Sequence, residues 1–290
     1  MIKNLIRCLL FFPITLLNKL LVIYSKIVSN FDPNGFECKL EELYQKQIDS
    51  KINKKLHNQN INYKPNLLLK KKRIIFYTPN KITNYRANTL FTKEEDTIKW
   101  IDQYGGKNNI FFDIGANIGV YSLYYAKLYK TKVFSFEPQH KNNALLEKNI
   151  QINKLENFIS IVPNPIYSKN KLDFLYSDDD NLSGSASTTF VEKKNLKSHK
   201  KKKKKTLSFT IDFLVENFLI PQPNLIKIDV DGNEHEVIKG AIKTINSSGC
   251  KSILIETFNK TDEQTKSILK KNFFLHNDSG VNKIYVKNNS

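Results

Sequence analysis

One short segment, residues 111–137, limits the fold of this chain more than any other part of the sequence. It opens with the pattern FFDIGANIG at 111–119 and closes with a second apolar run, Val133–Phe136, followed by Glu137. The glycines at 115 and 119 allow a tight turn and a close approach of the backbone to a ligand. We therefore expect a strand, a glycine turn, a helix over 118–129 and a second strand whose tip carries an acid. This arrangement is one half of a nucleotide-binding α/β unit.

The spacing of the glycines indicates which nucleotide this unit binds. A dinucleotide site requires G-x-G-x-x-G, but here Asn117 and Val120 stand at the second and third glycine positions. Asp113 suits a ligand that carries a cationic amine instead of a phosphate, and Glu137 can accept two hydrogen bonds from a ribose diol. S-adenosylmethionine (SAM) has both groups, so the pattern favours SAM over NAD. A purely structural turn is the other interpretation, and it leaves the placement of Glu137 unexplained.

Four segments in this order make the chain resemble the FkbM family of SAM-dependent methyltransferases. They are DIGANIG at 113–119, FEP at 136–138, LLEKNIQIN at 145–153, and IKIDVDGNE at 226–234 with Gly240-Ala241 behind it. The last segment departs from the family, which carries Glu-Gly-Ala-Glu where this chain has DGNE at 231–234. The resemblance covers roughly residues 73–258. It implies SAM as the cofactor and O-methylation of a hydroxyl on a sugar, glycan or secondary metabolite.

The expected site residues follow strand ends, because ligands bind there in a doubly wound sheet. The predicted cofactor residues are Asp113, Gly115, Asn117, Gly119, Glu137 and, beside the adenine, Asn164. The predicted catalytic residues are Asp229, Asp231 and Glu234. Asp229 is expected to orient the acceptor hydroxyl or to accept its proton. Two alternatives stay open: the three carboxylates also suit Mg²⁺ or Ca²⁺, and Glu234 and Asp231 are also typical of a helix cap and a turn.

Apolar runs and helical patterns alternate regularly from Asn109 to the end of the chain. We expect strands at 110–114, 132–136, 158–162, 225–230, 252–257, 272–276 and 282–287. We expect helices at 118–129, 139–153, 211–218, 233–246 and 261–271. This alternation indicates a mostly parallel sheet covered on both faces, with an antiparallel C-terminal hairpin. Together with the resemblance, it predicts the Rossmann-like, seven-stranded α/β sheet of class I methyltransferases with an N-terminal helical extension.

The chain is predicted to have three parts. Residues 1–30 are an amphipathic helix, 31–91 are a connector and cap, and 92–290 are the methyltransferase domain. The domain carries an irregular insertion at 168–206, whose lysines at 200–205 are expected to be disordered because they cannot pack.

Three local features near the acceptor side complete this prediction. Strands are expected at 73–77 and 85–91, and Thr92–Glu95 is expected to open the next helix as a capping box. Arg86 and Glu256 are additional candidate contacts of the acceptor.

Residues 4–29 place polar and apolar side chains on opposite faces of a helix. The uncharged run Cys8–Asn18 is shorter than the roughly 20 residues of a membrane span. We expect an interfacial helix that binds peripherally to the cytoplasmic face of the inner membrane. The alternative is a helix packed on its own domain or on a second subunit, as in a homodimer.

The formal net charge of +18 favours anionic partners. A small-molecule or glycan acceptor is expected, and a nucleic acid is not, because the lysines lack interleaved aromatic residues and no motif that holds a flipped base is present. Three widely spaced cysteines fit the reducing cytoplasm. Two rival functions remain: an NAD(P)-dependent oxidoreductase, which the missing glycines disfavour, and a non-catalytic membrane-associated binding module.

Overall fold

The computed structural model of the chain describes residues 56–60, 73–177, 182–185, 188–190, 202–217, 219–257 and 262–288. All of these except Leu56 belong to one compact unit, residues 57–290. The predicted helix over 4–29 and most of the predicted connector lie outside the described residues. Among the helices that the structure describes, none is long and apolar enough to cross a membrane.

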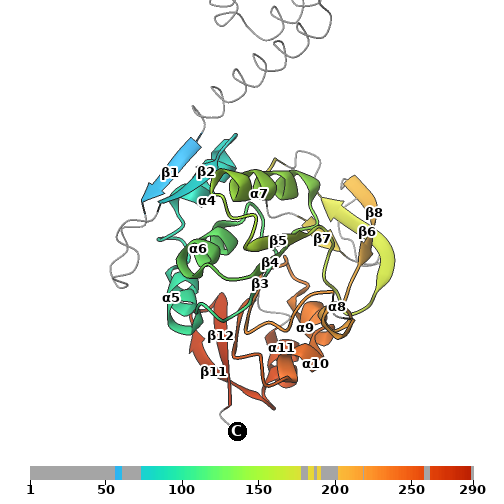
Figure 1. The fold of residues 1–290 in the computed structure, drawn as a ribbon. Coiled ribbons are helices and arrows are strands. Elements are labelled where there is room, and N and C mark those ends of the chain that lie inside the picture. The colour runs from blue at the N-terminus through green and yellow to red at the C-terminus, as the bar shows by residue number, and fades with distance from the viewer. Residues whose placement is uncertain are drawn as a thin grey trace, which may run out of the picture. The chain divides into compact units, whose positions relative to one another are not determined.

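A seven-stranded sheet forms the centre of this unit, in the order β11–β12–β10–β9–β3–β4–β5 (Figure 1). Its five parallel strands are β3 (Phe111–Ile114), β4 (Val133–Phe136), β5 (Ile159–Val162), β9 (Leu225–Ile228) and β10 (Ser252–Glu256). The hairpin of β11 (Phe273–Asp278) and β12 (Asn282–Lys287) joins β10 in antiparallel orientation. The predicted Rossmann-like class I methyltransferase sheet is therefore confirmed.

The strand order reverses between β3 and β9. The chain moves outward from β3 through β4 to β5, and then returns to place β9 on the other side of β3. The register pairs Ile114 with Ile228, so Gly115 and Asp229 follow at adjacent strand tips. This is the switch point at which doubly wound sheets bind ligands.

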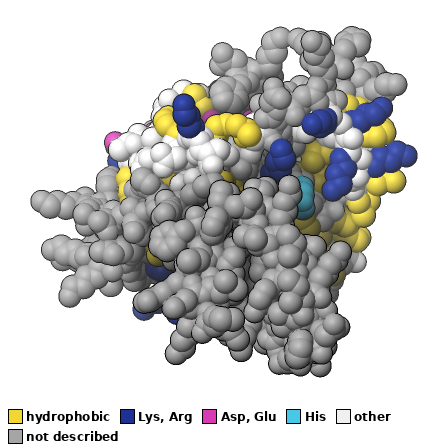
Figure 2. All heavy atoms as spheres, turned by 90° about the horizontal axis from the view of Figure 1, so that it is seen from above, with side chains coloured by type: hydrophobic (Ala, Val, Ile, Leu, Met, Phe, Trp, Pro, Cys, Tyr) yellow, Lys and Arg dark blue, Asp and Glu magenta, His cyan; other side chains and the backbone are white. Residues whose placement is uncertain are grey.

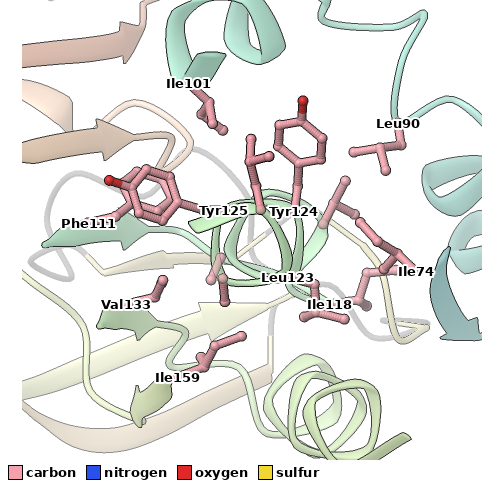
Figure 3. Packing of buried hydrophobic residues seen from close by; sticks show 14 of the residues in the cluster. Ile74, Leu90, Ile101, Phe111, Ile118, Leu123, Tyr124, Tyr125, Val133 and Ile159 are labelled. Carbon is pink, nitrogen blue, oxygen red and sulfur yellow. The ribbon is translucent and has the colours of Figure 1, made fainter. Parts of the chain in front are cut away.

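Successive side chains of the buried strands enter two different cores, because strand residues alternate between faces. Phe111 joins the core formed with α5 (Glu95–Tyr104), α6 (Val120–Tyr129) and α7 (His140–Ile152). Figure 3 shows this cluster, in which side chains of the sheet and of β2 surround α6. Phe112 joins the core formed on the other face with α8 (Ile211–Glu216), α9 (Glu234–Lys239), α10 (Ile242–Asn246) and α11 (Asp262–Leu269).

A short strand upstream of the sheet, β2 (Arg73–Tyr77), is tied to α7 by asparagine side chains. It also pairs with β1 (Leu56–Asn60) in a two-stranded sheet. Asn153 Oδ1 accepts a hydrogen bond from the Ile75 amide at 3.0 Å, and Asn153 Nδ2 donates to the Ile75 carbonyl at 2.7 Å. Asn149 Oδ1 accepts from the amide of Tyr77 at 2.8 Å. These side chains satisfy main-chain groups of β2 as a neighbouring strand would.

Replacing Asn153 by alanine is expected to lower the free energy of unfolding by about 1–3 kcal/mol, because both main-chain groups of Ile75 lose their partner. The matched control is Asn157→Ala at an exposed position, for which a change within about 0.5 kcal/mol is expected. Urea denaturation of both variants measures the difference. Equal stability of Asn153→Ala and the unaltered chain would show that this contact does not hold β2.

The prediction of a strand over 85–91 is wrong. Most of this segment belongs to α4 (Lys81–Asn88). The helix starts at a capping box in which the Asn80 side chain accepts from the Thr83 amide and the Thr83 side chain accepts from the Asn80 amide. This start signal outweighs the strand preference of the residues that follow it. The capping box predicted at Thr92 does not form, because α5 begins after Glu94 without a side-chain cap.

The insertion is more regular than predicted. β6 (Lys171–Ser177) pairs in antiparallel orientation with β7 (Thr188–Phe190) and with β8 (Lys202–Ser208). The prediction of disorder is therefore wrong for lysines 202–205, which lie in β8, while 200 and 201 lie outside the described residues. These lysines stay exposed and form their strand through backbone pairing with β6, which requires no packing of the side chains. The ammonium groups of Lys203 and Lys205 lie over the ring of Phe174, at 5.1 and 5.9 Å from its centroid.

Candidate functional site

A pocket, called here the main pocket, opens at the carboxyl ends of β3, β4, β5 and β9. It encloses about 680 Å³ of empty space, part of which is open to solvent. Six of the nine predicted site residues line it: Gly115, Asn117, Glu137, Asn164, Asp229 and Asp231. Asp113, Gly119 and Glu234 are not among its lining residues. Apolar side chains from the strand tips and the insertion, such as Phe136, Leu175 and Phe190, complete the wall.

The two glycines of the turn have different roles. Gly115 and Gly119 have φ of 84° and 85°, a conformation that favours glycine. A Cβ atom on Gly115 would overlap the carbonyl oxygen of Asp229, and one on Gly119 would overlap the side chain of Leu146. Gly115 therefore allows the close approach of two strand tips at the pocket, whereas Gly119 allows α6 to pack against α7.

Glu137 follows β4 and presents a buried carboxylate to the main pocket. Its Oε2 accepts a hydrogen bond from the Asn117 amide, and its Oε1 accepts one from the Gln139 amide, both at 2.8 Å. Burial raises the pKa of Glu137 to about 7, although the two amide donors oppose this shift. Each carboxylate oxygen has a second lone pair. The group is thus fixed in orientation and can still accept hydrogen bonds from a ligand.

Asp113 lies beneath the pocket instead of in its wall. Its Oδ2 accepts a hydrogen bond from Ser122 Oγ at 2.5 Å, and its side chain is fully buried. Burial raises the pKa of Asp113, while the charge of Lys227 acts in the opposite direction. The Asp113 side chain therefore stabilises the tip of β3 and the positive charge of Lys227. Its influence on a ligand in the pocket is electrostatic.

Asn117 joins the glycine turn to the insertion. It adopts a φ of 52°, and its Nδ2 donates to the carbonyl of Ser185 at 3.1 Å. Among the described residues its buried Oδ1 has no hydrogen-bond partner. Asn142 and Arg86 hold the same segment, because Asn142 Oδ1 accepts from the Gly184 amide at 2.7 Å and Arg86 Nε donates to the Gly184 carbonyl at 2.6 Å. Gly184 and Ser185 are thus held in place, and Ser185 forms part of the pocket wall.

Asn164 follows β5 at the opposite end of the pocket from the β9 tip. Its Nδ2 donates to the carbonyl of Leu207 in β8 at 2.9 Å. The side chain therefore links the insertion to the sheet, and its Oδ1 is the atom that can meet a ligand edge.

Asp229 is the carboxylate at the centre of the site. Its Oδ2 lies 3.1 Å from Nζ of Lys227, whose side chain is only 1% exposed, whereas that of Asp229 is 29% exposed. Burial opposes ionisation of Asp229, but the adjacent ammonium of Lys227 outweighs it and lowers the pKa of the carboxyl. Asp229 is therefore an ionised carboxylate that faces the pocket at neutral pH.

Lys227 was not predicted as a site residue, although it lies inside the apolar strand LIKI. Its ammonium is surrounded by the carboxyl groups of Asp113, Asp229, Glu94 and Glu256, which raise its pKa in spite of burial. It also lies over the ring of Tyr121, 5.0 Å from the centroid. A lysine in the middle of a fully buried strand is the sequence signal that could have revealed this cluster, since an unpaired buried charge is not tolerated.

Asp231 lies on the turn after β9, and Glu234 is the first residue of α9. Asp231 has a φ of 52° and lines the main pocket. Burial, together with the charge of Asp229, raises its pKa to about 7. Glu234 is almost fully buried and its Oε1 accepts from the Gly232 amide at 2.9 Å, so it stabilises the turn. Within the described residues, no group of three or more His, Cys, Asp or Glu side chains is placed to hold a metal ion.

A second pocket adjoins the main pocket on the side of α4 and α5. Both pockets are lined by Arg86, Gly115, Asn117 and Asp229. Glu94, Tyr121, Lys93 and Lys227 line the second pocket and not the main pocket. The Tyr121 hydroxyl donates to Glu94 Oε2 at 2.7 Å. Arg86 lines both pockets, and its contact with an acceptor stays a prediction. Glu94 and Tyr121 were not predicted, because they approach from distant segments.

The surface of the described part is rich in cations. In the view from above, Lys and Arg side chains are numerous on the face that can be seen, and Asp and Glu side chains are scarce there (Figure 2). This agrees with the net charge of +18, and such a surface attracts anionic molecules.

The chain resembles known proteins in sequence and in fold. Hexuronic acid methyltransferase AglP of Haloferax volcanii is 26% identical over 166 residues, which are 53% of this chain and 59% of the relative. The chain thus spans less than two thirds of that relative. Among solved structures, methyltransferase FkbM of Methylobacillus flagellatus KT gives a TM-score of 0.45 at 18% identity, covering 62% of this chain and 44% of the other. TrmK of M. capricolum, solved with S-adenosyl-homocysteine, gives 0.39 at 10% identity, covering 66% and 67%.

The sequence pattern of the methyltransferase FkbM domain matches residues 113–289. The match begins at Asp113, the first acid of the glycine turn, and runs through the tips of β4 and β9 to the C-terminal hairpin. Because it covers more than half of the chain, the protein belongs to the methyltransferase FkbM domain family.

Proposed function

We propose that this protein is a SAM-dependent methyltransferase that methylates a hydroxyl group of a sugar, a glycan or a secondary metabolite. The observation that carries the proposal is one pocket that presents Glu137 at the tip of β4 and Asp229 at the tip of β9. Family membership supports methyl transfer as the reaction. The relative named for hexuronic acid supports a sugar as the acceptor.

Three features of the main pocket suit SAM. Glu137 offers a fixed, buried carboxylate to the ribose hydroxyls. The buried Oδ1 of Asn117 has no partner among the described residues and can accept from a cationic amine. The missing Cβ at Gly115 leaves the backbone bare at the strand tips. Asp113 was expected to meet the amine directly, and its position beneath the pocket favours an indirect electrostatic contribution.

When bound, SAM supplies a methyl group activated by a positively charged sulfur. The task left to the protein is to orient the acceptor and to take up its hydroxyl proton as the oxygen gains the methyl group. Asp229 suits this task, because Lys227 keeps it ionised and it faces both pockets. Arg86 lines the same two pockets and can bind an acidic group of the acceptor. Contact of residues 4–29 with a membrane and formation of a homodimer remain expectations from the sequence.

Calorimetric titration of the full chain with S-adenosylhomocysteine tests whether the main pocket binds the cofactor. We expect micromolar binding and a loss of affinity of about 10- to 100-fold in Glu137→Gln, because the amide keeps one acceptor oxygen but loses the hydrogen bonds to a carboxylate, which are worth about 1.5–3 kcal/mol. Glu147→Gln, at an exposed position of α7, is the matched control and should bind as the unaltered chain does.

A parallel titration with NADH separates the alternatives. Binding of NADH without S-adenosylhomocysteine would favour an oxidoreductase and contradict the proposal. Binding of neither would favour a non-catalytic module. Transfer of a labelled methyl group from SAM to oligosaccharides that end in a uronic acid then tests the acceptor class.

A further inference from the structure

Glu256 ends β10 directly beside the proposed base. The register pairs Ile255 of β10 with Ile228 of β9, so Glu256 and Asp229 take adjacent positions beyond that pair. At these adjacent strand ends, the carboxyl groups of Glu256 and Asp229 lie close enough to share a hydrogen bond. Two carboxyl groups share a hydrogen bond only when one of them holds a proton. Asp229 is the ionised partner because Lys227 binds it at 3.1 Å, so Glu256 is the donor.

Asp229 is thus held from two sides. Lys227 is buried and cannot move to solvent, and Glu256 approaches from the neighbouring strand. The Asp229 side chain keeps 29% of its surface exposed, and that part faces the main pocket. A carboxylate fixed by two partners presents one defined direction to an acceptor, which is a requirement for efficient proton transfer.

Glu256 itself does not line the main pocket. It lines a separate cleft with Thr92, Lys93, Glu94 and Asn282. Asp229 lines both the main and the second pocket, whereas Glu256 lines neither, so Glu256 acts on the reaction through Asp229.

We propose that Glu256 is a positioning residue, whose protonated carboxyl donates a hydrogen bond that fixes Asp229 as the acceptor-facing base. This inference rests on the proposed methyltransferase function and adds a residue to it. In the working state one proton lies between the two carboxyl groups and remains on Glu256. The proton of the acceptor hydroxyl goes to Asp229.

The surroundings of Glu256 explain why it stays protonated. Burial and the adjacent charge of Asp229 raise the pKa of Glu256 to about 8, Lys227 opposes this shift, and Glu94 adds to it. The other charged groups of the cluster act on Asp229 or Lys227: Asp113 from β3, Arg86 from α4 and Asp231 from the turn after β9. Above about pH 8 the proton leaves, and the hydrogen bond becomes a contact between two negative charges.

Three forms of the full chain separate this role from a merely structural one. In the unaltered enzyme, kcat is expected to fall as the pH rises through about 8, because Asp229 loses its donor. Glu256→Gln keeps an amide donor that does not titrate, so its kcat should be close to the neutral-pH value and the alkaline fall should disappear. Glu256→Leu has no donor and should have low kcat at every pH. Glu263→Gln, at an exposed position of α11, is the control and should keep the profile of the unaltered enzyme.

A second measurement requires no acceptor. In the full chain labelled with ¹³C at the carboxyl groups, NMR signals of Asp229 and Glu256 should both shift with one midpoint near pH 8. In Glu256→Gln, the Asp229 signal should lose its transition near pH 8.

The outcomes distinguish the two proposals. Titration of Glu256 near the ordinary value of about 4.3 would overturn the positioning role, and so would an alkaline fall of kcat that persists in Glu256→Gln. In both cases, methyl transfer by the unaltered enzyme would leave the proposed function intact. If the unaltered chain binds no S-adenosylhomocysteine, the methyltransferase proposal fails and this inference fails with it.

Discussion

Replacing Lys227 by methionine is expected to lower the free energy of unfolding by about 3–5 kcal/mol, because it leaves buried carboxylates without their counter-charge. The side chain of Lys227 is 1% exposed, and its ammonium lies 3.1 Å from Asp229. Asp113, Glu94 and Glu256 are its other acidic neighbours. Methionine has a similar length and fills the same space, so the loss measures the charge and not a cavity.

The loss in free energy of unfolding caused by Lys227→Met should depend on pH in a defined direction. Without the cation, the buried acids have pKa values in the folded state above those in the unfolded state. At a pH low enough to protonate these acids in both the folded and the unfolded state, they destabilise the fold least. As the pH rises above their pKa in the unfolded state, the unfolded chain loses protons first and the fold becomes less stable. The difference from the unaltered chain should therefore be largest near pH 8 and should shrink toward about pH 5.

Urea denaturation at several pH values measures this effect. Lys270→Met, at an exposed position, is the matched control and should change stability by no more than about 0.5 kcal/mol. The double variant Lys227→Met, Asp229→Asn should be more stable than the sum of the single effects predicts, because each change removes a charge that the other leaves unpaired. Strict additivity would contradict the idea that the two side chains form one buried pair.

The fold could be predicted to a large extent because its signals are local. The apolar strand 111–114, the turn at Gly115 and the acid at Glu137 lie within one short stretch, and their order defines the nucleotide-binding half of the sheet. The errors occurred where non-local partners decide the structure. Lysines 202–205 have no packing signal, yet β6 supplies the backbone partners that make them a strand. The capping box at Asn80 determined α4 against the local strand preference.

The candidate site could likewise be predicted only in part. Glu137 and Asp229 were predicted from their places after apolar runs, and the structure places both in the main pocket. Asp113 was expected in the same pocket, but its neighbour Ser122 on α6 holds it beneath the surface. Glu94 reaches Tyr121 and Lys227 from the start of α5. Such contacts join segments far apart in the sequence, and a single sequence carries no signal for them.

Replacing Asp229 by asparagine is expected to lower kcat by about 10²- to 10⁴-fold, the usual contribution of a positioned general base. The amide has nearly the same shape but cannot take the proton of the acceptor hydroxyl. Methyl transfer from labelled SAM to an oligosaccharide that ends in a uronic acid measures the rate, and calorimetry with S-adenosylhomocysteine shows whether the cofactor still binds. Lost transfer with retained binding identifies Asp229 as a group that acts on the acceptor.

Two further variants make this result specific. Asp278→Asn, at an exposed position of β11, should transfer methyl groups at the rate of the unaltered enzyme. Asp231→Asn should lose less activity than Asp229→Asn, because Asp231 lines the pocket without a bond to Lys227. A large loss in Asp231→Asn together with a small one in Asp229→Asn would assign the base to Asp231. Of the two residues, only Asp229 is held ionised by a buried lysine and a neighbouring carboxyl. The geometry of β9 and β10 therefore favours the larger loss of activity in Asp229→Asn.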